Sequence, residues 1–271
     1  GSLPTHPPVR PARHPVRAPA RTVSRSPICS AVSTRGWHDL RAGLLEGRQD
    51  DPVYPSPMDP IDESEPSFVH AVDWALTTTR SVRRKLDWER PVPRELIEAC
   101  IDVAVQAPTG ANREAWRFLV LDAPGPKASL AALYQRAMAR YAALRPGADG
   151  PKPTAVGLAD RLAELPALIL VCSEGQPFED SNAMRVAFYG SVLPAAWSLM
   201  VALRARGIGG TWTTLHLVHE DEAAAALGIP PGVTQTVLLP IGFMSGARLR
   251  PAERLPARDV TYWNRWGTSQ D

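Results

Sequence analysis

The chain has 271 residues, 44% of them hydrophobic and 21% charged, which is the composition of an ordinary soluble globular protein. This composition excludes a fibrous protein and a chain that is disordered throughout. Thirty Lys and Arg against 28 Asp and Glu leave a formal net charge of +2, too little to indicate a dedicated polyanion binder, so we expect no nucleic-acid partner from charge alone.

The first fifth of the chain differs from the rest in composition. Residues 1–57 hold eight Arg, no Lys, four acidic residues and ten of the 28 prolines. Because this run has no sustained apolar periodicity, it cannot bury enough surface to offset the entropy lost on folding. We therefore expect residues 1–60 to be a disordered Pro/Arg-rich tail and residues 61–271 to form one folded domain.

Three interpretations of this tail stay open. It could be a basic arm that contacts nucleic acid or an Arg- and Ser-rich targeting peptide. It could also be a translated leader upstream of a natural start at Met58, which stands just ahead of the first acidic and amphipathic stretch. We favour the leader, and Gly1 and Ser2 are typical of a cloning scar.

The cysteines and one apolar stretch bear on the compartment. Cys29, Cys100 and Cys172 show no C-x-x-C spacing, which favours a reduced, cytoplasmic protein. Residues 186–203 carry no charge and are long enough to span a membrane. Because they contain glycine, proline and serine and have no companion span, we interpret them as a helix inside the protein or between subunits, with no membrane partner.

Hydrophobic periodicity predicts the elements of the first half of the folded domain. Helices are expected at residues 67–80 and 93–107, each with an apolar face that packs inward. A strand is expected at residues 116–121, and an amphipathic helix at residues 127–144.

The second half of the domain is richer in apolar runs. A short helix at residues 158–165 leads into a buried strand at residues 167–172. A long apolar helix is expected at residues 182–206, about 36 Å long at roughly 1.5 Å per residue, and residues 207–210 break it.

The last elements complete the domain. Residues 211–215 and 234–241 have the composition of strands, and residues 220–227 form a helix that Gly228 closes. A basic, Trp-rich arm follows at residues 248–267. Because helices and strands interleave without a regular βα repeat, the predicted fold class is α+β.

Several common catalytic motifs are missing. The sequence has no G-x-x-x-x-G-K-[ST] loop, no G-x-S-x-G elbow and no H-E-x-x-H helix. The Gly-Ile-Gly-Gly run at residues 207–210 follows a helix and precedes a strand, the reverse of the order in a dinucleotide loop, so we interpret it as a helix stop. His216 and His219 make a zinc site conceivable, but too few ligands lie nearby, and a surface histidine pair is favoured over a metal site.

A cluster of basic and hydroxyl side chains remains. Arg80, Ser81, Arg83 and Arg84 bring three guanidinium groups and one hydroxyl to the end of a predicted helix. Forked N–H donors match phosphate oxygens, so the cluster predicts a phosphate site, although arginine clusters also occur on solvated faces.

Several segments together resemble the FMN-dependent nitroreductase family. In the order in which that family has them, they are RSVR at 80–83, PVP at 91–93, APTGAN at 107–112 followed by WRF at 116–118, GGTWT at 209–213, and LPIGF at 239–243 before RLP at 254–256. The resemblance implies a three-layer sandwich with a central, mainly antiparallel sheet. It also implies a homodimer with two flavin sites at the interface, where the long apolar helix would lie.

The resemblance also implies site residues for FMN. Arg80, Ser81, Arg83 or Arg84, and Arg254 correspond to holders of the phosphate and ribityl chain. The expected contacts to the ring are Pro108, Thr109 and Asn112 from the other subunit, Thr211, Trp212 and Thr213 at its border, and Arg161 near its pyrimidine edge.

The implied activity is that of an FMN-dependent oxidoreductase. NAD(P)H would reduce the flavin at N5 and leave, and a nitroaromatic, quinone or similar acceptor would then take the electrons in a ping-pong cycle. No catalytic side chain and no metal are expected. Two alternatives stay open: a flavin-binding storage or sensing protein without useful turnover, and a deazaflavin-dependent reductase.

Two positions depart from the family pattern. The chain reads Asn-Arg-Glu-Ala-Trp at residues 112–116, where the family usually has Asn-x-Gln-Pro-Trp, and Ala252 stands where a basic residue is frequent. Substrate choice and some cofactor contacts are therefore not carried over.

Overall fold

A four-stranded antiparallel sheet organises the part of the chain that the computed structural model describes, residues 66–145, 147, 150–246 and 248–268. In order across the sheet, the strands are β1 (Trp116–Leu121), β2 (Ala167–Glu174), β4 (Val233–Phe243) and β3 (Ile208–Gly210). Every neighbouring pair is antiparallel. The predictions for residues 1–60, for a start at Met58 and for Cys29 lie outside the described residues.

Strand β2 forms where it does because both of its faces are apolar. Ile169 and Val171 belong to the hydrophobic cluster on one face of the sheet, and Leu168 and Leu170 to the cluster on the other. All four side chains are fully buried. Because both faces of β2 are apolar, other elements must pack on each face to bury them, which gives a layered domain.

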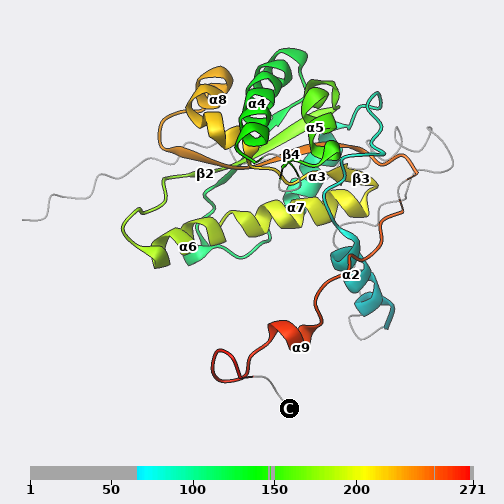
Figure 1. The fold of residues 1–271 in the computed structure, drawn as a ribbon, viewed down its shortest axis with the longest axis vertical. Helices are drawn as coiled ribbons and strands as arrows, with labels where there is room; N and C mark the ends of the chain where they lie inside the picture. Colours follow the sequence, from blue (N-terminus) through cyan, green and yellow to red (C-terminus); the bar gives the residue numbers. More distant parts are fainter. Residues whose placement is uncertain (1–65, 146, 148–149, 247, 269–271) are drawn as a thin grey trace, which may run out of the picture. The chain divides into compact units, whose positions relative to one another are not determined.

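Helices supply that cover in two layers (Figure 1). On one face lie α3 (Arg94–Ala104) and α7 (Leu193–Ala205); on the other lie α4 (Pro124–Leu144), α5 (Pro153–Asp160) and α8 (Glu220–Leu227). The remaining helical elements are α2 (Pro66–Thr78), α6 (Asn182–Gly190), α9 (Ala257–Val260) and the 3₁₀ turns η1 (Gly110–Asn112), η3 (Leu162–Glu164) and η4 (Leu215–His219). The predicted three-layer α+β architecture is confirmed.

The long apolar segment is two helices rather than the single helix predicted at residues 182–206. Helix α6 ends at Gly190, and α7 begins at Leu193 with Pro194 in its first turn, where a missing N–H costs no helical hydrogen bond. The two helices run nearly in line (Figure 1). Within the described residues this is the one helical stretch, residues 182–205, that is long and apolar enough to cross a membrane. Helix α7 is mostly buried in the core, whereas α6 has no buried residue.

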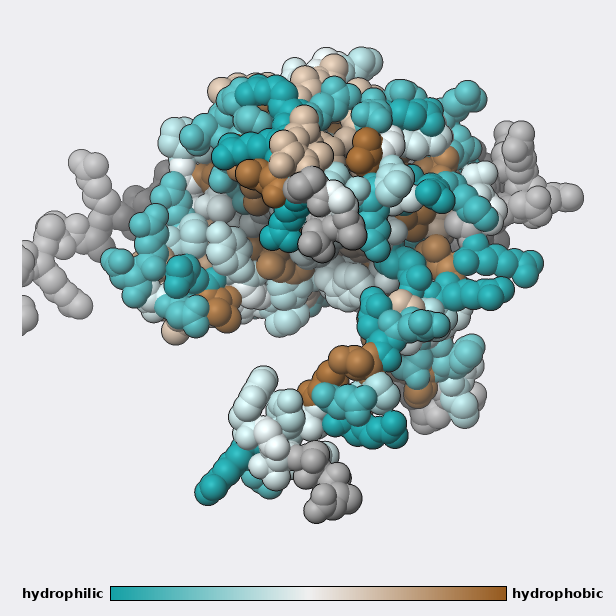
Figure 2. Space-filling view, in the orientation of Figure 1, coloured by the Kyte–Doolittle hydropathy of each residue, from teal (hydrophilic) through white to brown (hydrophobic). Residues whose placement is uncertain are grey.

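The expectation that the first helix packs inward is wrong. Helix α2 exposes most of its apolar side chains, including Val69, Val72 and Leu76. It contacts α7 through its last turns, where the Arg204 guanidinium lies 4.1 Å from the centre of the Trp74 ring. The periodicity of α2 indicates an apolar face correctly, but none of the residues that the structure describes covers that face. Figure 2 shows apolar surface among hydrophilic residues over α2 and the C-terminal arm.

The strand predicted at residues 211–215 begins earlier and is shorter. Strand β3 covers Ile208–Gly210, Thr213 makes an isolated bridge to Leu238, and η4 begins at Leu215. The glycines that suggested a helix stop are needed here because another segment lies against them. A Cβ atom on Gly209 would stand 2.8 Å from Leu86 Cδ2 and 3.1 Å from Val82 Cβ.

This close approach predicts that Gly209→Ala destabilises the fold. The added methyl must displace the side chains of Leu86, Met244 and Val82, which all lie within 3.1 Å of it, at a cost of about 1–3 kcal/mol in the free energy of unfolding. Urea denaturation followed by circular dichroism measures that energy. Gly157→Ala is the matched control, because its Cβ would meet open space in α5 and alanine favours a helix. Equal stability of Gly209→Ala and the wild type would contradict this packing.

Candidate functional site

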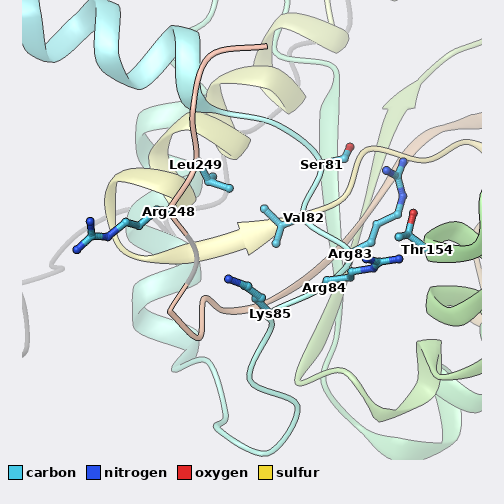
Figure 3. Close-up of a pocket in the computed structure, with 8 residues that line it drawn as sticks. All are labelled: Ser81, Val82, Arg83, Arg84, Lys85, Thr154, Arg248 and Leu249. Carbon is cyan, nitrogen blue, oxygen red and sulfur yellow. The ribbon is translucent and has the colours of Figure 1, made fainter. Parts of the chain in front are cut away.

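A basic hollow of about 320 Å³ lies beside the segment that follows α2 (Figure 3). Its lining residues are Ser81, Val82, Arg83, Arg84, Lys85, Thr154, Arg248 and Leu249. Figure 3 shows Arg83 and Arg84 extending toward Thr154, with Arg248 on the opposite side. Four cationic side chains and two hydroxyls, with no carboxylate in the lining, are a donor set for an anion such as a phosphate group.

Strand β3 and the residues after it hold this segment in place. The Val82 N–H donates to Gly210 O at 2.9 Å, and the Thr211 hydroxyl donates to Val82 O at 2.7 Å. The Trp212 N–H donates to Ser81 Oγ at 3.0 Å. The structure therefore brings together the two predicted groups, residues 80–84 and residues 211–213. Thr211 is buried and its hydroxyl is used by the backbone, so it positions the site rather than facing a ligand.

Arg80 provides a further donor. Its Nε atom is buried and has no hydrogen-bond partner within the described part of the chain. A buried N–H group without an acceptor is costly, so an acceptor is expected in the functional state. Arg80 itself does not line the basic hollow, but it directly precedes Ser81, which does, so an anion bound in the hollow is a candidate acceptor.

A second hollow of about 260 Å³ lies between η1 and α6. Its lining residues are Pro108, Thr109, Gly110, Ala187, Gly190 and Ser191. The Gly110 N–H donates to Ser191 Oγ at 2.9 Å, and the Ser191 hydroxyl donates to Ala187 O at 2.7 Å, which ties the loop to α6. Two of the predicted ring contacts, Pro108 and Thr109, therefore line a different hollow from Ser81 and Arg83.

The loop after Thr109 is strained. Ala111 and Asn112 both have φ of 54°, in the left-handed region that costs energy for residues with a Cβ, least so for asparagine. The Thr109 hydroxyl spans the turn by donating to Arg113 O at 2.7 Å. Asn112 does not line either hollow, so its predicted contact with a ring stays a prediction.

Two other predicted residues lie apart from both hollows. Arg161 pairs with Glu164 at 2.6 Å, and its guanidinium lies 4.1 Å from the centre of the Trp88 ring. Arg254 donates to the carbonyl of its neighbour Glu253 and is exposed on the C-terminal arm. The hollow instead contains Arg248, six residues earlier in the chain.

Sequence reasoning missed several residues at the site. Lys85 directly continues the basic run and could have been included on that ground. Thr154 and Arg248 come from segments far away in the chain, and no local pattern marks them. Tyr134 lies in the amphipathic helix predicted at residues 127–144 and was not predicted at the site, yet its hydroxyl lies 2.9 Å from Thr213 Oγ1.

The predicted surface histidine pair is wrong for His216. Its side chain is fully buried, neither ring nitrogen has a partner in the described residues, and burial lowers its pKa to about 4. His219 instead lies near the surface and contacts Glu222 at 2.8 Å. Within the described part of the chain, no three His, Cys, Asp or Glu side chains converge as metal ligands.

The buried imidazole predicts acid sensitivity. His216 titrates near its ordinary pKa of 6.5 in the unfolded chain and at about 4 in the fold, so between these values the unfolded state binds more protons. Stability contributed by neutral His216 is therefore lost as the pH falls from 6.5 to 4, by about 3 kcal/mol in all. Urea denaturation of the wild type and His216→Leu across this range isolates the effect. The control is His70→Gln, because His70 is an exposed histidine on α2. If the free energy of unfolding had the same pH dependence in the wild type and in His216→Leu, His216 would not be the source of the acid sensitivity.

Comparisons with known proteins agree with this arrangement of elements. Residues 76–243, more than half of the chain, match the nitroreductase family. The chain belongs to the nitroreductase family. Members of this family are flavin oxidoreductases. The nitroreductase fold is confirmed by a solved nitroreductase-like protein from Bacillus cereus, with 19% identity, a TM-score of 0.56, and coverage of 77% of this chain and 98% of the other.

Curated relatives of this nitroreductase-family chain include iodotyrosine deiodinases. The enzyme of Rattus norvegicus is 30% identical over 176 residues, covering 63% of this chain and 61% of the relative. The chain thus spans about three fifths of the length of the rat enzyme. An NADH dehydrogenase of Thermus thermophilus is 26% identical over 206 residues, covering 70% of this chain and 94% of the relative. A solved iodotyrosine deiodinase, bound to FMN and 3-iodo-L-tyrosine, is 22% identical with a TM-score of 0.54, covering 69% of this chain and 98% of the other.

Proposed function

We propose that this protein is an FMN-dependent oxidoreductase whose basic hollow holds the flavin phosphate. The observation that carries the proposal is the hollow itself, in which residues 81–85 of a nitroreductase-family chain line a cationic cavity while hydrogen-bonded to Gly210–Trp212. The residues present fit the group, because the orphaned Arg80 Nε and the lining Arg, Lys and hydroxyl groups are all donors.

The chain's part in the reaction is to bind and orient. When bound, FMN supplies a ring that accepts and returns a hydride, so no side-chain nucleophile is required. Arg83 and Arg84 would neutralise the phosphate, with each charge-assisted hydrogen bond worth about 1.5–3 kcal/mol. Ser81, which already accepts from Trp212, keeps its own hydroxyl proton to donate.

A second copy of the chain would complete the site. Pro108 and Thr109 line a separate hollow in one protomer, and apolar side chains stand exposed on α2, α6 and the C-terminal arm, where Trp266 is 90% exposed. Burying such surface is the usual basis of an obligate dimer. We therefore propose a homodimer in which Asn112 and Arg254 act across the interface and α6 contributes to it. Analytical ultracentrifugation of the full chain and of a variant ending at residue 250 tests this, and a monomeric wild type that binds FMN would contradict it.

For the electron donor we propose NAD(P)H, and for the acceptor a nitroaromatic, a quinone or a similar compound. The Thermus thermophilus NADH dehydrogenase among the relatives supports a nicotinamide donor. Anaerobic mixing of the holoprotein with NADH or NADPH should bleach the flavin absorbance, and steady-state plots should give the parallel lines of a ping-pong cycle. Intersecting lines would argue against that cycle. The buried free thiols of Cys100 and Cys172 accord with the proposed cytoplasmic location.

Reductive deiodination is a second candidate. The rat iodotyrosine deiodinase, at 30% identity, favours it. The test is to incubate the reduced holoprotein with 3-iodo-L-tyrosine and to measure iodide release. Iodide release without turnover of nitroaromatics or quinones would select this activity.

Simple measurements distinguish the proposed NAD(P)H-dependent enzyme from the two alternatives that the sequence left open. A storage or sensing protein would bind FMN but show no rapid bleaching by any donor. A deazaflavin-dependent reductase would be reduced by a deazaflavin and not by NADH or NADPH.

A further inference from the structure

Tyr134 is a buried phenol on α4 that faces the segment after β3. Its side chain is 3% exposed, and its hydroxyl oxygen lies 2.9 Å from Thr213 Oγ1. Thr213 is one residue after Trp212, whose N–H donates to Ser81 in the wall of the basic hollow. Tyr134 is therefore connected to the wall of the basic hollow through Thr213 and Trp212, two residues predicted to border the flavin ring.

The position of Thr213 is fixed by its backbone. Its N–H donates to Leu238 O at 3.1 Å, and its carbonyl accepts from the Leu238 N–H at 2.9 Å. A residue held on both sides by strand-like pairing has little freedom beyond the rotation of its side-chain hydroxyl. The direction of the Thr213 O–H is thus the variable that a neighbour can set.

The hydrogen-bond donors around Thr213 Oγ1 show how Tyr134 sets the direction of the Thr213 O–H bond. Within the described residues, the Tyr134 hydroxyl has Thr213 as its one hydrogen-bond partner. Either hydroxyl could donate by distance alone, but burial separates the two cases. If Thr213 donated to Tyr134, the phenol proton would be buried without an acceptor, whereas the proton of the half-buried Thr213 is not enclosed in this way. Tyr134 therefore donates, and the Leu215 N–H also points at Thr213 Oγ1, at 3.4 Å. With its oxygen accepting from two donors, Thr213 directs its own proton away from both.

Charge at the site is consistent with this contact. Burial raises the pKa of Tyr134, the hydrogen bond with Thr213 opposes that rise, and the positive charge of Arg83 opposes it further. Arg83 therefore lies close enough to the phenol to act on it, and the phenol stays protonated as a donor at neutral pH.

We propose that Tyr134 is a positioning residue of the flavin site, which turns the Thr213 hydroxyl so that its proton is available to a flavin bound against residues 211–213. The proposal rests on the proposed FMN function. A donor beside a flavin stabilises the electron-rich reduced form more than the oxidised form, so Tyr134 tunes the reduction potential without touching the cofactor.

The test uses FMN-loaded full-length protein and Tyr134→Phe, which keeps the ring and removes only the hydroxyl. We expect the ratio of the dissociation constants for reduced and oxidised FMN to change about tenfold against the reduced form, a fall in midpoint potential of about 30 mV. Tyr141→Phe, which removes the same oxygen two turns later on α4, is the matched control and should leave the potential unchanged.

A double-mutant cycle isolates the path through Thr213. Thr213→Val should lower the potential by a similar amount, and Tyr134→Phe added to it should lower it no further. Thr213→Ser keeps the hydroxyl and should retain the wild-type potential. An unchanged potential in FMN-loaded Tyr134→Phe, or an equal further fall in the Thr213→Val background, overturns this inference and leaves the FMN function standing. A wild-type protein that binds no FMN overturns both.

Discussion

Replacing Arg83 by alanine should weaken FMN binding by about 10- to 100-fold. The reason is the loss of a forked donor from the basic hollow, where each charge-assisted hydrogen bond to a phosphate is worth about 1.5–3 kcal/mol. Fluorescence titration of FMN into cofactor-free protein measures the dissociation constant. Arg83→Lys should fall between alanine and wild type, because lysine keeps the charge and loses the fork.

The matched control for Arg83 is Arg94→Ala. Arg94 is an exposed arginine on α3 whose Nε lies 2.7 Å from Asp122, so its removal changes the net charge by the same amount outside the hollow. It should leave FMN affinity within about twofold, since exposed ion pairs contribute little. If both variants bound FMN as tightly as the wild type, the phosphate would have to lie elsewhere.

Replacing Leu199 by alanine should give the largest loss of stability. Leu199 is 0% exposed in the middle of α7, within the cluster that joins this helix to α3 and the sheet. Truncation removes buried methyl groups and leaves a cavity, which together cost about 2–5 kcal/mol. Urea denaturation measures the change in the free energy of unfolding. Leu144→Ala at the end of α4, where the side chain is 71% exposed, should change it by less than about 0.5 kcal/mol.

The outcome for Leu199 also bears on the apolar helices. A loss below about 1 kcal/mol would show that α7 is not held by the core and would contradict its burial. Since α6 continues α7 with its side chains exposed, the same measurement on Val186→Ala in α6 should show little effect in a monomer. A protein-concentration dependence of the Val186→Ala effect would instead indicate that α6 is buried in a dimer.

The sequence predicted most elements because their signals are local. Strand β2 is an apolar run and β4 an apolar run rich in β-branched residues. Helix α3 follows a proline and carries its buried residues at helical spacing. The errors arose where distant segments decide. Residues 208–210 form a strand because they pair with residues 241–243 of β4, and a one-dimensional pattern does not contain that pairing.

In the candidate site, too, residues marked by a local pattern were predicted and residues brought in by distant segments were not. The run at residues 80–84 was found because its charges are adjacent in the chain, whereas Thr154, Arg248 and Tyr134 reach the site only through the packing of α4, α5 and the C-terminal arm. His216 was misjudged because the sequence offered too few neighbouring ligands for a metal site, and a surface histidine pair was the remaining interpretation. Instead, η4 turns this imidazole into the core.

The pairing between Val82 and Gly210 has a consequence for the protein's behaviour without its cofactor. The Val82 N–H, which holds the segment that lines the basic hollow, also donates to Gly210 of the edge strand β3. This strand is short and pairs only with β4 among the described strands. If the hollow holds the flavin phosphate as proposed, fraying of this edge strand and release of FMN are therefore coupled. Slower deuterium uptake at Val82 and Ile208 on loading would record this coupling, and partial depletion during purification would leave a population with a frayed edge strand that is prone to self-association.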